Sequence, residues 1–376
     1  MTPWVNYAAG HRGEQPVAQT HSVVNADTAK AVGPAVMSAL AADELPSPLV
    51  GAAARAVVNK LLALSAEIVA RSESDASLSA KKHADGTPSP SVLLLHNLTR
   101  DWAEKRLRHP RYVSLHSPAA TYDAQKTLGG KWIHTAGSST TRFVYEGLRT
   151  ALNYRGMPGA INDTCWASPK WQEERDYAYL LACRGAMHAY EATNDALHSR
   201  LSYTWKDAMY GWQDAKLFAR WCAAREAPDV FLLNSGIHQF YYEDGYWFRQ
   251  LHSYENNKEA FTVPALWVAH YLNQTAMLVQ ALDVLGRCET GRHGRRRGGM
   301  CVVWKGTNLI PGYYNHLDAF NEVTAAAFLA AGFSVADPGE VTKANVGVAD
   351  VHHHQNIFNG EILKPLLPAL ERICPE

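Results

Sequence analysis

The chain has 376 residues, of which 47% are hydrophobic and 19% charged, so it is long enough for one large or two small domains with a buried core. Lysine and arginine together number 36, as do aspartate and glutamate, and the net charge is zero. This balance gives no general electrostatic reason to bind nucleic acid or an anionic membrane. The one basic run, at 292–297, is interpreted as a solvated loop, with a local phosphate or polyanion patch as the alternative.

The six cysteines include no Cys-x-x-Cys pair, which argues against zinc clusters and thioredoxin-type chemistry. The even number suits disulfides, and Cys288 with Cys301 could close the Gly/Arg-rich loop between them. Asn-x-Thr triplets begin at Asn97, Asn162 and Asn273, as in glycosylated secretory proteins. The first residues lack the pattern of a signal peptide. The compartment therefore stays open, with the secretory pathway or the cell exterior preferred to the cytoplasm.

Residues 1–45 show no clear periodicity and are interpreted as a loose leader. Hydrophobic residues recur near helical spacing over 47–73, which predicts an accessory helix that the turn residues at 85–90 terminate. We therefore expect an N-terminal extension with one helix, residues 1–90, followed by a catalytic domain, residues 91–376.

Beyond residue 90, short apolar runs alternate with longer helical patterns. Strands are predicted at 131–136, 201–205, 229–233, 300–304 and 333–336. Helices are predicted at 140–154, 214–225, after Pro264, at 317–331 and at 357–373. This alternation predicts an α/β fold with a doubly wound, mostly parallel sheet, in which ligands bind at the carboxyl ends of the strands. The apolar stretch 265–285 carries five polar residues, so a buried helix fits it better than a membrane span.

The first candidate site, residues 137–142 (Gly-Ser-Ser-Thr-Thr-Arg), lies between a predicted strand and a predicted helix. A serine such as Ser139 in the first helical turn has free backbone N–H groups beside it and the positive end of the helix dipole behind it. Such groups stabilise the oxyanion of an acyl-transfer intermediate. Gly137 allows the sharp turn. An ordinary Ser/Thr helix cap is the alternative interpretation.

A second segment supplies what a serine nucleophile needs, a base and an orienting carboxylate. Asp350 precedes His353 by three residues, in a predicted loop before the last helix. A solvated histidine-rich loop or a weak metal site is the alternative. Because no carboxylate or cysteine cluster elsewhere completes a ligand set, we expect neither a metal nor a cofactor.

A third segment, residues 234–238 (Asn-Ser-Gly-Ile-His), follows the strand predicted at 229–233. The amide of Asn234 or the N–H of Gly236 could add an oxyanion donor, with His238 in the same turn. The alternative is a turn in which asparagine and glycine have their usual conformational roles.

Together these segments resemble the SGNH (GDSL-like) hydrolase superfamily, and within it the PC-esterase and trichome-birefringence-like branch, over about residues 125–370. Residues 130–142 match the strand and the GDSxxR block of that branch, and residues 232–238 match its third block. Residues 302–307 match the next strand, and residues 333–337 together with 350–353 match the closing strand and the DxxH block. The resemblance implies a flavodoxin-like strand order. It also implies Ser139 as nucleophile, His353 as general base and Asp350 as its partner, with Ser139 N–H and Asn234 or Gly236 as oxyanion donors.

The chain departs from the pattern of that branch at two positions. Ser138 replaces the aspartate after the first glycine, and Gly236 stands where the third block has asparagine, with Asn234 two residues earlier. Residues 94–100 imitate the first block after a strand-like run, but Asn97 occupies the nucleophile position. The α/β-hydrolase fold is a less suitable match, since its elbow needs a small residue where Thr141 stands.

The resemblance predicts acyl transfer through an acyl-serine, by an ester hydrolase or an O-acyltransferase, on a small-molecule or polysaccharide ester. Relatives in that branch act on O-acetyl groups of carbohydrates, and aromatic residues are dense at 166–248. Tyr246 and Trp247 are the candidate sugar contacts, and Arg142 could touch an anionic group or simply pair with an acid. The alternative is a catalytically silent relative that binds a glycan or a protein, for which Ser138 is the main argument.

Overall fold

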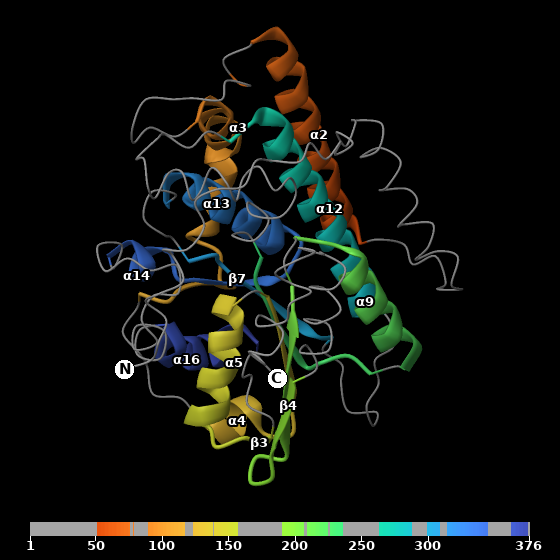
Figure 1. Cartoon of the computed structure of the whole chain (residues 1–376), viewed down its shortest axis with the longest axis vertical. Coiled ribbons are helices and arrows are strands. Elements are labelled where there is room, and N and C mark those ends of the chain that lie inside the picture. The colour runs from red at the N-terminus through yellow and green to blue at the C-terminus, as the bar shows by residue number, and fades with distance from the viewer. Residues whose placement is uncertain are drawn as a thin grey trace, which may run out of the picture.

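In the computed structural model, eight strands form one mixed sheet in the order β1-β8-β7-β6-β2-β5-β4-β3 (Figure 1). The structure describes residues 51–75, 78, 89–116, 123–137, 139–156, 190–206, 209–224, 226–235, 263–287, 299–308, 314–344 and 362–374. The strands are β1 (Tyr112–Ser114), β2 (Trp132–Gly137), β3 (Arg155–Gly156), β4 (Tyr190–Asn194), β5 (Ser199–Trp205), β6 (Val230–Leu233), β7 (Cys301–Lys305) and β8 (Ser334–Asp337). Neighbours from β1 to β5 pair parallel, whereas β4 pairs antiparallel with both β5 and β3.

Helices cover both faces of this sheet. They are α2 (Ala52–Ser74), α3 (Pro90–Arg106), α4 (Ala124–Leu128), α5 (Ser139–Ala151), α9 (Trp212–Ala224), α12 (Ala265–Arg287), α13 (Tyr314–Ala330), α14 (Gly339–Ala344) and α16 (Lys364–Ile373). One hydrophobic cluster joins the sheet to α2, α3, α9, α12 and α13, and a second joins the other face to α5 and α16 (Figure 1). Successive strand residues alternate between the two clusters, with Ile133 in one and Trp132 in the other.

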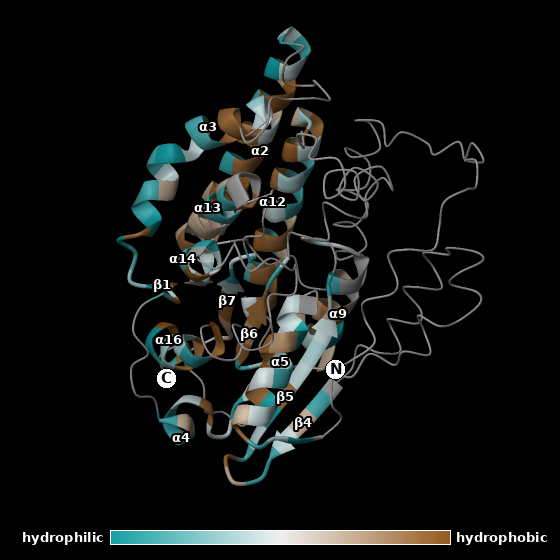
Figure 2. Cartoon of the chain, turned by 60° about the vertical axis from the view of Figure 1, so that its left-hand side comes forward, coloured by the Kyte–Doolittle hydropathy of each residue, from teal (hydrophilic) through white to brown (hydrophobic). Residues whose placement is uncertain are grey.

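The predicted α/β class with a mostly parallel sheet is confirmed. Each of the five predicted strands is present with its bounds shifted by no more than two residues, and the predicted helices correspond to α2, α5, α9, α12, α13 and α16. Apolar runs such as Val230–Leu233 are buried along their whole length, which is typical of parallel strands covered on both faces. Hydrophobic residues accordingly gather where helices meet the sheet, and the outer side of α3 is hydrophilic (Figure 2).

The strand-like run that precedes the imitation of the first block at 94–100 is not a strand, because this whole stretch lies inside helix α3. Pro90 begins this helix, where its missing N–H costs nothing, and the buried residues Val92, Leu95, Thr99 and Ala103 recur every three to four positions. Strands β1, β3 and β4 were not predicted either. In β4, only every second residue is buried, so it lacks the continuous apolar run that marks the inner strands.

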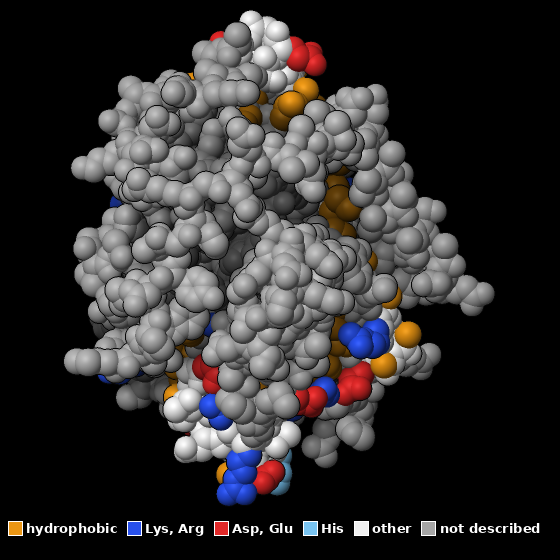
Figure 3. Space-filling model, in the orientation of Figure 1, with side chains coloured by type: hydrophobic (Ala, Val, Ile, Leu, Met, Phe, Trp, Pro, Cys, Tyr) orange, Lys and Arg blue, Asp and Glu red, His pale blue; other side chains and the backbone are white. Residues whose placement is uncertain are grey.

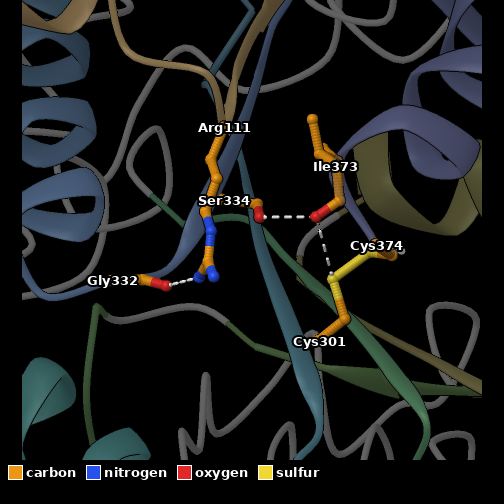
Figure 4. The surroundings of a disulfide bond; sticks show 6 residues. All are labelled: Arg111, Cys301, Gly332, Ser334, Ile373 and Cys374. Carbon is orange, nitrogen blue, oxygen red and sulfur yellow. Dashed lines mark hydrogen bonds between the residues drawn. A yellow bond between two sulfur atoms is a disulfide. The ribbon is translucent and has the colours of Figure 1, made fainter. Parts of the chain in front are cut away.

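The suggested bond between Cys288 and Cys301 is also wrong. Cys301, at the start of β7, is bonded to Cys374, directly after α16, with 5.6 Å between the Cα atoms (Figure 4). Ser334 on β8 donates a hydrogen bond to the carbonyl of Ile373 (3.0 Å), so the end of α16 is held at two points. The pairing follows from proximity in the fold, which the sequence spacing does not reveal. Cys222 is also disulfide-bonded.

The N-terminal helix α2 packs along α12 in the opposite direction. The Gly51 backbone N–H at its start bonds the Asp283 carboxylate near the end of α12 (2.8 Å), and the Ser65 hydroxyl bonds the Ala269 carbonyl (3.1 Å). Its buried residues, among them Leu61 and Ile68, belong to the same cluster as the sheet. The predicted accessory helix is therefore part of the main core.

None of the described helices is long and apolar enough to cross a membrane. Near the β4–β5 turn, the described surface carries side chains of both charges (Figure 3). Arg200 on β5 pairs there with Glu191 and with Glu226 (3.0 Å for the second pair).

Candidate functional site

The carboxyl ends of β2 and β6 meet at a reversal in the order of the strands. After β2 the chain forms β3, β4 and β5 on one side of it, and then crosses to β6 on the opposite side, before continuing outward to β7 and β8. In open α/β sheets, the crevice outside the carboxyl ends at such a switch point is the usual ligand site.

The turn from β2 to α5 brings a serine to this place. β2 ends at Gly137 and α5 begins at Ser139, so a single residue separates strand and helix. The Gly137 carbonyl accepts hydrogen bonds from the Tyr203 hydroxyl (2.8 Å) and from the Lys206 backbone N–H (3.0 Å), which hold the turn against β5. Ser139 thus stands where backbone N–H groups lack partners within the helix and where the helix dipole is positive.

The turn that follows β6 lies directly against the first turn. The Asn234 backbone N–H bonds the Ala136 carbonyl (2.9 Å), and the Asn234 carbonyl oxygen would lie only 3.0 Å from a Cβ placed on Gly137. The two segments that the sequence analysis singled out are therefore adjacent in space, although about a hundred residues separate them in the chain.

The side chain of Asn234 faces β7. Its amide nitrogen donates to the Lys305 carbonyl (2.7 Å) and to the Thr307 hydroxyl (3.3 Å), and the residue is buried. Because both N–H bonds of this amide are used within the protein, it is not available as an oxyanion donor in this arrangement. Asn234 instead ties the end of β6 to the end of β7.

Thr307, two residues after β7, connects three elements. Its hydroxyl donates to the Ser235 carbonyl (2.6 Å), while its backbone N–H and carbonyl bond the side-chain amide of Asn321 on α13 (2.8 and 2.7 Å). We refer to Asn321, Thr307, Asn234 and Ser235 as the Thr307 network. Every member is buried, so the network fixes the strand ends from within the protein.

Lys305 ends β7 with a fully buried ammonium group. It donates to the Asn308 side-chain oxygen (2.9 Å) and to the Gly306 carbonyl (3.1 Å). Burial lowers the pKa of Lys305 to about 7, although the nearby Asp337 carboxylate acts in the opposite direction. The carboxylate of Asp337 itself accepts hydrogen bonds from the Tyr112 hydroxyl and the Gly339 backbone N–H.

A buried ion pair lies beside the β2–α5 turn. The Lys206 ammonium is 2.6 Å from the Asp214 carboxylate, and the two side chains are only 4% and 10% exposed. Asp214 also accepts from the Gly211 backbone N–H (2.9 Å). Because the Lys206 backbone N–H bonds the Gly137 carbonyl, the pair helps to fix the strand that supports the serine turn.

Several polar groups at this edge are buried without a hydrogen bond in the described part of the chain. They are the hydroxyls of Thr141 and Ser235 and the amide nitrogen of Asn308, which follow β2, β6 and β7 respectively; six further such atoms occur elsewhere in the described residues. Most buried polar groups in proteins have a partner, so the three at the strand ends suit a place where a ligand or ordered water supplies the missing bonds.

The structure brings together Gly137, Ser139 and Asn234, while Arg142 lies further along α5 with its guanidinium 5.3 Å from the ring centre of Phe143. The other predicted site residues lie outside the described residues: Asp350, His353, Gly236, His238, Tyr246 and Trp247. For Ser139, the structure describes the backbone, which is helical.

Thr307, Asn321, Lys206 and Lys305 were not predicted as site residues. One signal was present for the two lysines, because Lys305 ends β7 and Lys206 directly follows β5, and a charged residue at such a place is poorly suited to a core. The contacts of Thr307 with Ser235 carried no signal, since they depend on β6 and β7 being neighbours.

No group of three or more His, Cys, Asp or Glu side chains within the described ranges could hold a metal ion. In comparisons with known proteins, no protein-family model, no curated protein and no solved structure matches the chain.

Proposed function

We propose that this chain is a serine-dependent acyl-ester hydrolase or O-acyltransferase with Ser139 as its nucleophile. The observation that carries the proposal is the position of Ser139, at the first residue of α5, directly behind β2 and at the switch point beside the turn after β6. Helix N-termini at such points stabilise developing negative charge. The order β5-β2-β6-β7-β8 supports an SGNH-type sheet, since it corresponds to the flavodoxin-like order 2-1-3-4-5.

In the proposed reaction, the Ser139 hydroxyl attacks the ester carbonyl carbon while His353 takes its proton and Asp350 orients His353. The resulting oxyanion is held by the Ser139 N–H and by the N–H of Gly236. The C–O bond to the alcohol then breaks, and His353 returns the proton to the leaving alkoxide. Water or a second hydroxyl then attacks the carbonyl carbon of the acyl-serine while His353 takes its proton. The bond between that carbon and the Ser139 oxygen breaks, and His353 returns the proton to Ser139.

The proposed substrate is an O-acetyl group of a carbohydrate, with Tyr246 and Trp247 as ring contacts. This part of the proposal rests on the resemblance to the PC-esterase branch and on the aromatic residues at 166–248. Disulfides such as Cys301–Cys374 persist in oxidising compartments, which supports a secretory or extracellular location.

The test is covalent labelling with a fluorophosphonate, followed by intact-mass analysis, together with turnover of a short acetyl ester. We expect one adduct per chain and ester turnover in the wild type, and loss of both in Ser139→Ala. Ser72→Ala, on α2, is the control and should keep both. Ser235 also lies at this edge, so loss of the adduct in Ser235→Ala but not in Ser139→Ala would show that Ser235 is the nucleophile and Ser139 is not. A folded wild type without adduct or turnover would favour the catalytically silent binding module.

A further inference from the structure

The Thr307 network reaches the turn after β6, and that turn supplies the second oxyanion donor in the proposed reaction. We infer that Thr307 is a positioning residue for acyl transfer, because its hydroxyl holds the Ser235 carbonyl and thereby fixes the end of β6 against the turn that presents Ser139. This inference rests on the proposed function and adds to it a residue that does not contact the substrate.

The first step is the geometry at the end of β6. The Ser235 carbonyl accepts a hydrogen bond of 2.6 Å from the Thr307 hydroxyl. Thr307 follows β7, which flanks β6 on the side away from β2. The Ser235 carbonyl is therefore held toward β7, whereas the backbone N–H of the preceding Asn234 bonds β2 and its carbonyl lies against Gly137. Thr307 thus fixes Ser235 relative to the turn at which Ser139 begins α5.

The second step is that Thr307 is itself held firmly. Its backbone N–H and its carbonyl both bond the amide of Asn321, so α13 fixes the orientation of the residue. The Thr307 hydroxyl also accepts from Asn234 (3.3 Å), which leaves its proton for the Ser235 carbonyl. All four residues of the network are buried, so water does not readily replace a bond that is lost.

The third step concerns what the network aligns. The Asn234 backbone N–H bonds β2 at the Ala136 carbonyl, one residue before the glycine of the nucleophile turn. The network therefore joins the turn after β6 to α13 on one side and to β2 on the other. Alignment of the turn after β6 with the nucleophile turn acts on the transition state more than on the bound ester, so its loss should lower kcat and leave KM nearly unchanged.

The test compares Thr307→Val, which replaces the hydroxyl by a methyl group, with Thr307→Ser, which keeps the hydroxyl. The matched control is Thr324→Val. Thr324 lies three residues after Asn321 on α13, is fully buried, and shares a hydrogen bond of 2.7 Å with the Tyr271 hydroxyl on α12, which does not belong to the network. Both valine variants should lower the melting temperature to a similar degree.

Steady-state turnover of an acetyl ester and the rate of fluorophosphonate labelling are then measured on all four proteins. Thr307→Val should lower kcat by about tenfold to a hundredfold with KM close to the wild-type value, whereas Thr307→Ser and Thr324→Val should keep kcat near that of the wild type. Equal kcat in the two valine variants would overturn the positioning role while the acyl-transfer proposal stands. A wild type that neither labels nor turns over ester would overturn both.

Discussion

Gly137 and Thr141 lie so close together that a Cβ on Gly137 would be 2.1 Å from the Thr141 hydroxyl oxygen and 2.7 Å from the Thr141 Cβ. Real Cβ atoms do not approach other atoms so closely, and the Thr141 Cβ cannot move without its backbone. The first turn of α5 is thus packed directly onto the end of β2, and only glycine fits between them. This contact sets how near Ser139 comes to the turn after β6.

We predict that Gly137→Ala displaces the first turn of α5. The free energy of unfolding should fall by about 1–3 kcal/mol because of overpacking, and ester turnover should fall by about a hundredfold because a shift of about 1 Å disturbs the alignment of the nucleophile. Chemical denaturation and steady-state kinetics measure the two effects.

The control for this prediction is Gly286→Ala, which lies in helix α12 with no atom within 4 Å of the added Cβ. There the substitution should stabilise the protein slightly, since alanine favours a helix by about 0.5–1 kcal/mol over glycine. If Gly137→Ala retained wild-type stability and turnover, the close packing of Gly137 on Thr141 would not hold in solution.

The architecture was predictable because its signal is local. Inner strands such as β6 and β7 are continuous apolar runs that end in turn residues, and this pattern identifies buried parallel strands without knowledge of their neighbours. The same criterion failed at α3. Its run Val92–Leu95 is as apolar as a strand, and only the later buried positions Thr99 and Ala103 distinguish a helix from it.

The residues of the candidate site also fall into two groups, those with a local sequence signal and those that depend on distant partners. Gly137, Ser139 and Asn234 could be proposed from the sequence because each stands at or just after the end of a strand, where the chemistry of the turn is visible in a few neighbouring residues. Thr307 could not be found, since its partner Ser235 is 72 residues away and becomes a neighbour only when β6 and β7 pair. The same limit explains the incorrect disulfide, because proximity in sequence favoured a short loop over the pairing of Cys301 with a distant cysteine.

We predict that the double variant Cys301→Ser, Cys374→Ser keeps the fold but loses about 2–5 kcal/mol of unfolding free energy, since the bond closes a loop across 73 positions in sequence. Thermal denaturation with and without reductant measures the loss. The reductant should destabilise the variant less than the wild type, because the variant retains only the remaining disulfides. Peptide mapping without reduction provides the independent check, and a peptide linking Cys301 to Cys288 would contradict the structure.

The last prediction concerns the buried charge of Lys305. Its pKa is about 7 in the folded protein and 10.5 in the unfolded chain, because burial disfavours the ammonium form. Between these two pH values the unfolded chain binds a proton that the folded protein does not. The free energy of unfolding therefore rises with pH across this window, at up to about 1.4 kcal/mol per pH unit, and the cost of the buried charge is fully present below pH 7.

Lys305→Met removes the charge and keeps the length of the side chain. The difference in unfolding free energy, wild type minus variant, should therefore be lowest below pH 7 and should climb between pH 7 and 10.5. Denaturant titrations at several pH values measure this difference. Lys364→Met is the control, since Lys364 lies exposed on α16 and this variant keeps Lys305, so it should show the same rise in unfolding free energy as the wild type. Parallel curves for the wild type and Lys305→Met would mean that Lys305 reaches water in the folded protein.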